Sequence, residues 1–137
     1  MILSAATPIF NRYQGLTVAA KISGVHWLYK TPAHAAELTA GYKNDQGTAY
    51  TPIAQMFKKY GVTFDFTCLE MKDSQFPSSC YCGPEELVGQ TETAAVNTNI
   101  HYTGENALSV YDNGSYSQIE VRLERTLSNN SLPCLIS

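Results

Sequence analysis

The stretch that decides the fold covers residues 51–66 and reads TPIAQMFKKYGVTFDF. Its first half places apolar residues three or four positions apart, which is the period of an amphipathic helix. We expect Thr51 to cap this helix, Pro52 to take its first position and Gly61 to end it. The next residues, Val62–Met71, are rich in β-branched and aromatic side chains, which predicts a strand. A helix that leads directly into a strand indicates an α/β fold.

The same alternation continues on both sides of this stretch. Upstream, Leu16–Tyr29 begins as a strand, and a helix is predicted before it over Ile2–Phe10. Downstream, a helix is predicted from Pro84 and a third strand over Asn99–Ala107. This order predicts a parallel sheet with right-handed crossovers. The fold class is therefore α/β, with about three βα units and long loops at the C-terminal ends of the strands.

Polar and charged residues gather where each predicted strand ends. The three segments are Lys21 to His26, Thr67 to Glu70, and Thr103 to Asn106. Ligands of parallel α/β folds bind at the carboxyl ends of the strands, so this edge is the predicted site. From these residues alone, Glu70 is the natural catalytic partner of Glu105, since both carboxylates follow strands that we expect to be neighbours.

Composition excludes several classes of function. Nine Lys and Arg residues against twelve Asp and Glu residues give a net charge of −3 without a basic block, which argues against nucleic acid as a partner. No window approaches the roughly 20 apolar residues that span a membrane, and the start, MILSAATPIF, lacks the basic region of a signal peptide. We expect a soluble protein of the cytoplasm or a plastid rather than a secreted one. Its oligomeric state is left open.

The four cysteines, Cys68, Cys80, Cys82 and Cys134, do not have the spacing of a zinc site. Small disulfide scaffolds contain a higher density of cysteine. Free thiols are the favoured interpretation, and neither a metal nor a cofactor is expected.

Four motifs resemble the last third of the β-amylase barrel in order and spacing. They are KISGVHWLYKTPAHAAELTAGYKN, PIAQMFKKYGVTFDFTCLEMKD, PEELV and GENALSVYD. The family consists of inverting, exo-acting hydrolases of α-1,4-glucans. The resemblance runs from about Thr17 to Ile119, with a weaker part back to Ile2. It implies a partial (β/α)8 or TIM barrel over residues 1–120, containing the sixth, seventh and the start of the eighth units, and a divergent tail over residues 121–137.

The resemblance also implies a role for individual residues. Glu105, in GENAL, matches the general base of the family. The residues that match substrate-binding positions are Lys21, His26, Thr67, Asn106 and Ala107. In the family the general acid lies on an earlier strand, upstream of this sequence. The resemblance therefore makes Glu70 a structural carboxylate. Neither Arg122 nor Arg125 aligns with the arginine that the family carries on its last strand.

Inverting hydrolysis needs two carboxyl groups, about 6.5–9.5 Å apart, so that a water molecule fits between one of them and the sugar. Glu105 suits the role of base if a cation such as Lys21 keeps its pKa low. The expected function is that of a β-amylase, which releases maltose with inversion from the non-reducing ends of starch or malto-oligosaccharides. The alternative is a truncated, non-catalytic polypeptide without the general acid, which binds glucan weakly at most.

The resemblance has a consequence for folding. Three of eight barrel strands leave two unpaired edges and an uncovered inner face. We therefore expect the polypeptide expressed alone to be inactive, and to fold poorly or to aggregate.

Overall fold

The structure, a computed structural model, describes residues 2–129 and 135–136. Helices and strands alternate along the chain, so the α/β prediction with three βα units is confirmed. The elements are α1 (Ile2–Phe10), β1 (Ala19–Lys21), α2 (Ala35–Leu38), α3 (Tyr50–Tyr60), β2 (Thr63–Phe66), α4 (Pro84–Thr98), β3 (Tyr102–Gly104), α5 (Asn113–Asn129) and β4 (Leu135–Ile136). Two short 3-10 helices, Asp73–Gln75 and Ser78–Cys80, lie in the loop between β2 and α4.

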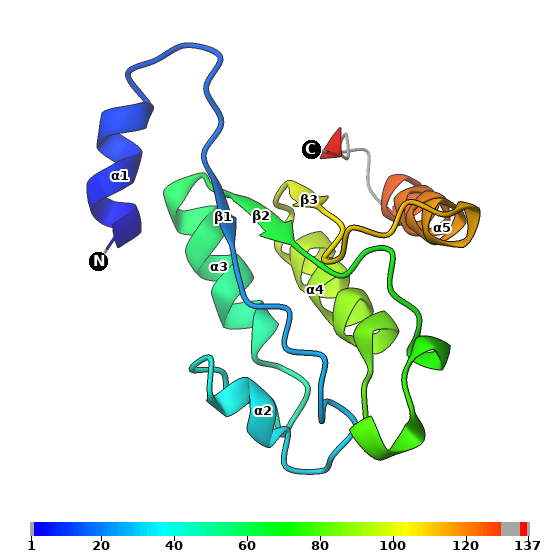
Figure 1. The fold of residues 1–137 in the computed structure, drawn as a ribbon. Helices are drawn as coiled ribbons and strands as arrows, with labels where there is room; N and C mark the ends of the chain where they lie inside the picture. The colour runs from blue at the N-terminus through cyan, green and yellow to red at the C-terminus, as the bar shows by residue number, and fades with distance from the viewer. Residues whose placement is uncertain (1, 130–134, 137) are drawn as a thin grey trace.

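The four strands form one parallel sheet in the order β1-β2-β3-β4, which is also their order in the chain (Figure 1). Lys21 of β1 lies opposite Asp65 of β2, and Asp65 lies opposite Thr103 of β3. Thr103 in turn lies opposite Leu135 of β4. Each pair of neighbouring strands is joined by a helical crossover, so the carboxyl ends of all four strands meet at one edge of the sheet.

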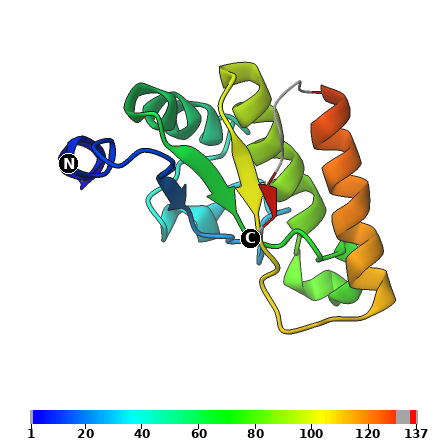
Figure 2. The same cartoon turned by 90° about the horizontal axis from the view of Figure 1, so that it is seen from above.

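One face of the sheet packs against α3 and α4 and forms the core. Phe64, Phe66 and Tyr102 point into it and are all buried. The ring of Phe64 lies edge-on to Phe57 of α3, with centroids 5.2 Å apart, and 5.6 Å from the ring of Tyr102. Figure 2 shows α3, α4 and α5 on the same side of the strands. The apolar faces of the helices and the alternate side chains of the strands therefore pack together in a single core.

The opposite face of the sheet is polar. Lys21, Asp65 and Thr103 lie in one row across it, because they are register partners and side chains alternate along a strand. In the described part of the chain, no helix covers this face (Figure 2). The alternation of Thr63, Phe64, Asp65 and Phe66 thus separates the helix-packed core from a polar surface.

The start of α3 differs from the prediction. The helix begins at Tyr50 with Ala49 as its cap residue, so Thr51 does not cap it and Pro52 is not its first residue. The side chain of Asn44, in the preceding loop, accepts a hydrogen bond from the Ala49 N–H at 3.0 Å. A side chain of the preceding loop, rather than Thr51, therefore bonds to the backbone at the start of α3.

The predicted helix ends agree better with the structure. Gly61 ends α3 in the left-handed conformation, with φ 64°, and its N–H bonds back to carbonyl groups of the last turn. Pro84 is the first residue of α4, where its missing N–H needs no partner.

The strands are shorter than predicted. Residues 67–71 are buried but irregular, because Cys68 adopts a left-handed backbone with φ 71° and turns the chain out of the sheet. The third strand begins only at Tyr102, since α4 ends in a left-handed Asn99. The first strand ends at Lys21, and the segment that follows turns back on itself, with the His26 N–H bonded to the Gly24 carbonyl.

The C-terminal region contains two elements that the sequence did not predict. Helix α5 runs across the predicted boundary between residues 120 and 121, and β4 adds a fourth parallel strand beside β3. Cys68, Cys80 and Cys82 are free, as predicted, whereas Cys134 lies outside the described residues. Over the residues that the structure describes, no helix is both long enough and apolar enough to cross a membrane.

Candidate active site

An ion pair at the carboxyl edge of the sheet joins two of the predicted site residues. The Lys21 ammonium at the end of β1 donates a hydrogen bond to Oε1 of Glu105, which directly follows β3. Strand β2 lies between these two strands, so the pair reaches across it on the polar face. The two side chains are 51% and 32% exposed, which leaves both open to a ligand.

A close contact between backbone and side chain joins the loops after β1 and β2. A Cβ atom on Gly24 would lie 2.3 Å from Cγ2 of Thr67 and 2.9 Å from Sγ of Cys68. Only glycine therefore permits this approach. The contact places Thr67, which is buried, against the segment that carries Lys21 and His26.

His26 and Trp27 lie side by side but in different environments. His26 is buried, with its ring 4.5 Å from that of Trp27 and 5.0 Å from that of Phe76. Burial lowers the pKa of His26, and the nearby Glu70 carboxylate opposes this only in part, so the imidazole is neutral at neutral pH. Its Nδ1 is shielded from solvent and has no hydrogen-bond partner among the described residues. Trp27 is 58% exposed and offers a flat apolar face.

Glu70 is buried, and its carboxylate supports the segment after Glu105. It accepts hydrogen bonds from the N–H groups of Ala107 at 3.0 Å and Leu108 at 2.8 Å. The Asn106 side chain completes this turn by donating to the Leu108 carbonyl at 2.7 Å. Glu70 therefore holds the loop that carries the predicted glucan-contact residues. The contacts favour a structural role over a catalytic one.

Two further residues belong to this edge of the sheet. Asp65 lies in the same row as Lys21, and the alternation of phenylalanine and polar residues in β2 was a signal that could have identified it. Arg122 of α5 is buried, and its Nε donates to the Leu69 carbonyl at 3.2 Å. No sequence signal predicted that contact, because α5 itself was not predicted.

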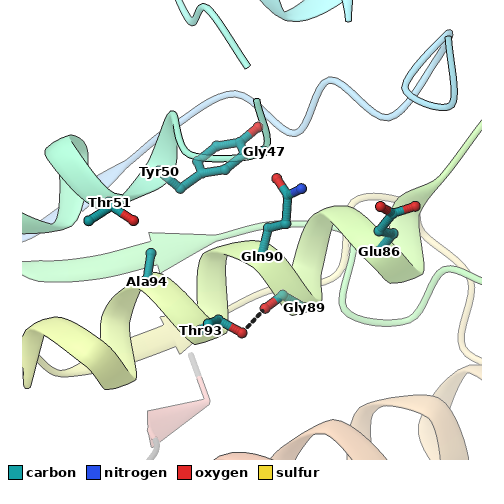
Figure 3. A pocket seen from close by; sticks show the side chains of 8 residues that line it. All are labelled: Gly47, Tyr50, Thr51, Glu86, Gly89, Gln90, Thr93 and Ala94. Atoms are coloured by element: carbon teal, nitrogen blue, oxygen red, sulfur yellow. Dashed lines mark hydrogen bonds between the residues drawn. The ribbon is translucent and has the colours of Figure 1, made fainter. Parts of the chain in front are cut away.

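A separate pocket of about 390 Å³ lies between the start of α3 and α4 (Figure 3). Tyr50 and Gln90 line it together with Glu86 and Thr93, and none of its lining residues is a predicted site residue. Behind it, the buried Glu37 carboxylate accepts hydrogen bonds from Tyr50 and from Asn44. These buried bonds order the long loop between β1 and α3.

No described part of the chain brings together three or more His, Cys, Asp or Glu side chains in a way that could hold a metal ion. The side chains at this edge of the sheet provide one ammonium group, two carboxylates on the polar face, a neutral imidazole and an exposed indole. They belong to Lys21, Asp65, Glu105, His26 and Trp27. Such a set can bind sugar hydroxyl groups, stack against a pyranose ring and accept a proton from water.

The chain matches one protein family over nearly its whole length. The description of that family is Glycosyl hydrolase family 14, and the match covers residues 1–136. The chain is 44% identical to β-amylase 2, chloroplastic, of Oryza sativa subsp. japonica over 119 residues, or 86% of this chain and 21% of that protein. It is 44% identical over 119 residues to β-amylase 1, chloroplastic, of Arabidopsis thaliana, covering 86% and 20%. It is 45% identical to the β-amylase of Glycine max over 121 residues, covering 88% and 24%.

A solved structure agrees with these sequence matches. The catalytic domain of the β-amylase from Paenibacillus polymyxa superposes on 98% of this chain with a TM-score of 0.79, at 31% identity. The aligned region is 30% of that domain, so the four parallel strands and their helices correspond to part of a TIM barrel. The chain spans about a quarter or less of the length of these curated relatives. Sequence and fold together show that the chain belongs to glycosyl hydrolase family 14.

Proposed function

We propose that this chain supplies the general-base half of a β-amylase active site, with Glu105 as the base. The observation that carries the proposal is the Lys21–Glu105 ion pair at the carboxyl edge of the sheet, on its polar face. A neighbouring cation favours the ionised form of a carboxylate, and a base must be ionised. Both side chains remain partly exposed, so a water molecule and a sugar can reach them.

The other residues of the edge are suited to binding a glucan. Trp27 offers an exposed indole face against which a pyranose ring can stack. Lys21 can donate hydrogen bonds to sugar hydroxyl groups, and Thr67 lies on the loop that Gly24 contacts. Asn106 and Ala107 follow Glu105 directly and are held in place through Glu70. The substrate we propose is an α-1,4-glucan of the starch type, approached from its non-reducing end.

The reaction we propose is a single displacement with inversion. Glu105 takes a proton from water while the water oxygen attacks the anomeric carbon, and a carboxylic acid on the other side protonates the leaving oxygen. Glu70 is a poor candidate for that acid, because it is buried and already accepts two backbone hydrogen bonds. We propose that the acid comes from a part of the family barrel that precedes these residues. The chloroplastic relatives suggest a plastid as the compartment.

The test uses a chimaera in which residues 1–136 replace the matching segment of the Glycine max β-amylase. Glu105→Gln should lower maltose release from maltopentaose between about 100-fold and 10,000-fold, since an amide does not act as a base. Glu120→Gln, on the exposed surface of α5, is the matched control and should keep the parent rate. The anomeric form of the released maltose, followed by proton NMR, should be inverted relative to the substrate.

Two outcomes would contradict the proposal. Maltose release by Glu105→Gln at the parent rate would rule out Glu105 as the base. A chimaera that binds maltopentaose without turnover would instead favour the alternative, a glucan-binding polypeptide that has lost catalysis.

A further inference from the structure

Asp65 occupies a central position on the polar face of the sheet. It lies on β2, between the strand that carries Lys21 and the strand that precedes Glu105. Lys21 and Asp65 are register partners, and the same row continues to Thr103, two residues before Glu105. Because residues two apart on a strand share a face, Asp65 and Glu105 are diagonal neighbours on that face. The Lys21 ammonium therefore has a carboxylate on each of the two strands beyond its own.

The hydrogen bonding of the Asp65 carboxylate is incomplete. Its Oδ1 is shielded from solvent and has no hydrogen-bond partner within the described part of the chain. Burial raises the pKa of Asp65, while the Lys21 charge and the Phe66 N–H lower it. A carboxylate with a shielded, unpaired oxygen beside a lysine can attract that lysine more strongly than an exposed one.

We propose that Asp65 is a positioning residue of the proposed reaction, whose negative charge also attracts the Lys21 ammonium and so weakens the hold of that ammonium on Glu105. This inference rests on the proposed function. The charged groups beside Asp65 on this face are Lys21 from β1 and Glu105 after β3.

The charge of Asp65 acts on Glu105 in a definite direction. With Asp65 ionised, Glu105 has a like charge nearby and is held less firmly by the ammonium, so it binds a proton more readily and is the stronger base. Without the Asp65 charge, the attraction between Lys21 and Glu105 is no longer opposed. Glu105 then ionises at a lower pH, and its ionised form is a weaker base.

The experiment measures the pH dependence of maltose release in the chimaera defined above. Asp65→Asn should move the acidic limb of the kcat/KM profile to lower pH by about 0.5 units or more, as expected when one like charge is removed from a neighbouring site. The value of kcat should fall severalfold, and KM should change less than kcat. Asp65→Ser removes the same charge without the amide and should shift the limb in the same direction. Asp65→Glu keeps the charge and should leave the limb near its parent position.

The control for long-range charge is Asp45→Asn, an exposed loop residue whose carboxylate lies 3.6 Å from the Lys43 ammonium. It changes the net charge equally and should leave the limb in place. An acidic limb that stays within about 0.2 pH units of the parent in both charge-removing variants, or that moves to higher pH, would overturn the inference. If Glu105→Gln kept its activity, the proposed function itself would fail. If Glu105→Gln were inactive and the limb stayed fixed, only the role of Asp65 would fail.

Discussion

The two faces of the same short strands differ in what they contact and in how well the sequence predicted them. On the helix side, Phe64 and Phe66 are fully buried and pack edge-on against other aromatic rings. On the other side, Asp65 is only half buried and lies beside a lysine. In β2, adjacent residues thus alternate between a packed core and a charged surface.

The difference shows that the residues of the core and the residues of the proposed chemistry lie on separate faces of the sheet. Parallel strands covered on both faces are usually apolar throughout. The polar row of Lys21, Asp65 and Thr103 departs from that pattern, and the proposed site lies along it. The helix-packed face contains the core, and the polar face carries the residues to which we assign binding and catalysis.

The most severe loss of stability is expected when the helix-packed face is disrupted. Phe64→Ala removes a ring that contacts Phe57, Phe66 and Tyr102 in the middle of the core. The substitution should reduce the free energy of unfolding by about 3 to 5 kcal/mol, because it loses buried apolar surface and leaves a cavity. The measurement is the urea midpoint of the chimaera, read by circular dichroism. A loss below about 1 kcal/mol would mean that this face is not a packed core.

A smaller effect is expected at the junction of the two regions, where Glu70 holds the loop after β3. Glu70→Gln keeps the shape but turns an amide NH₂ towards one of the two backbone N–H donors, from Ala107 or Leu108. The free energy of unfolding should fall by about 1 to 3 kcal/mol, the cost of an unsatisfied buried group. The urea midpoint measures this loss, and maltose release from maltopentaose tests the role in catalysis.

The kinetic result separates a structural carboxylate from a catalytic one. Glu70→Gln should retain more than about a tenth of the parent rate, since general acid or base groups contribute about 100-fold or more. Glu120→Gln serves again as the exposed control. A loss of rate as large as that of Glu105→Gln, without a change in the urea midpoint, would return Glu70 to the role of catalytic partner.

The helix-packed side could be predicted because its signals are local. The apolar spacing over 53–60, the glycine at 61 and the proline at 84 are all read within a few residues. The start of α3 could not be predicted, because the Asn44 side chain fixes the Ala49 N–H from the preceding loop, which the buried Glu37 orders. The strands were predicted to be longer than they are, because left-handed residues such as Cys68 turn the chain where no glycine signals a turn.

The polar edge could be predicted only in part. Strand order placed Lys21 and Glu105 at the same edge, and the structure joins them in an ion pair. Their roles came from the resemblance to a family and stay proposals. The part proposed for Asp65 depends on register across three strands, which a single sequence does not specify.

The least change is expected for the stability that the polar face itself costs the fold. Burial raises the pKa of Asp65 above its ordinary value of 3.8, so the folded state holds this proton more firmly than the unfolded state does. Ionisation of Asp65 therefore opposes folding, with a penalty that grows as pH rises from 3.8 through the folded pKa and is complete above it.

Asp65→Asn should raise the melting temperature of the chimaera slightly at pH 7, and this gain should disappear near pH 3, where both side chains are neutral. Calorimetric scans at the two pH values, with Asp45→Asn as the exposed control, measure the difference. A lower melting temperature at pH 7 would show instead that the attraction of Lys21 outweighs desolvation, and that Asp65 stabilises the face on which it lies.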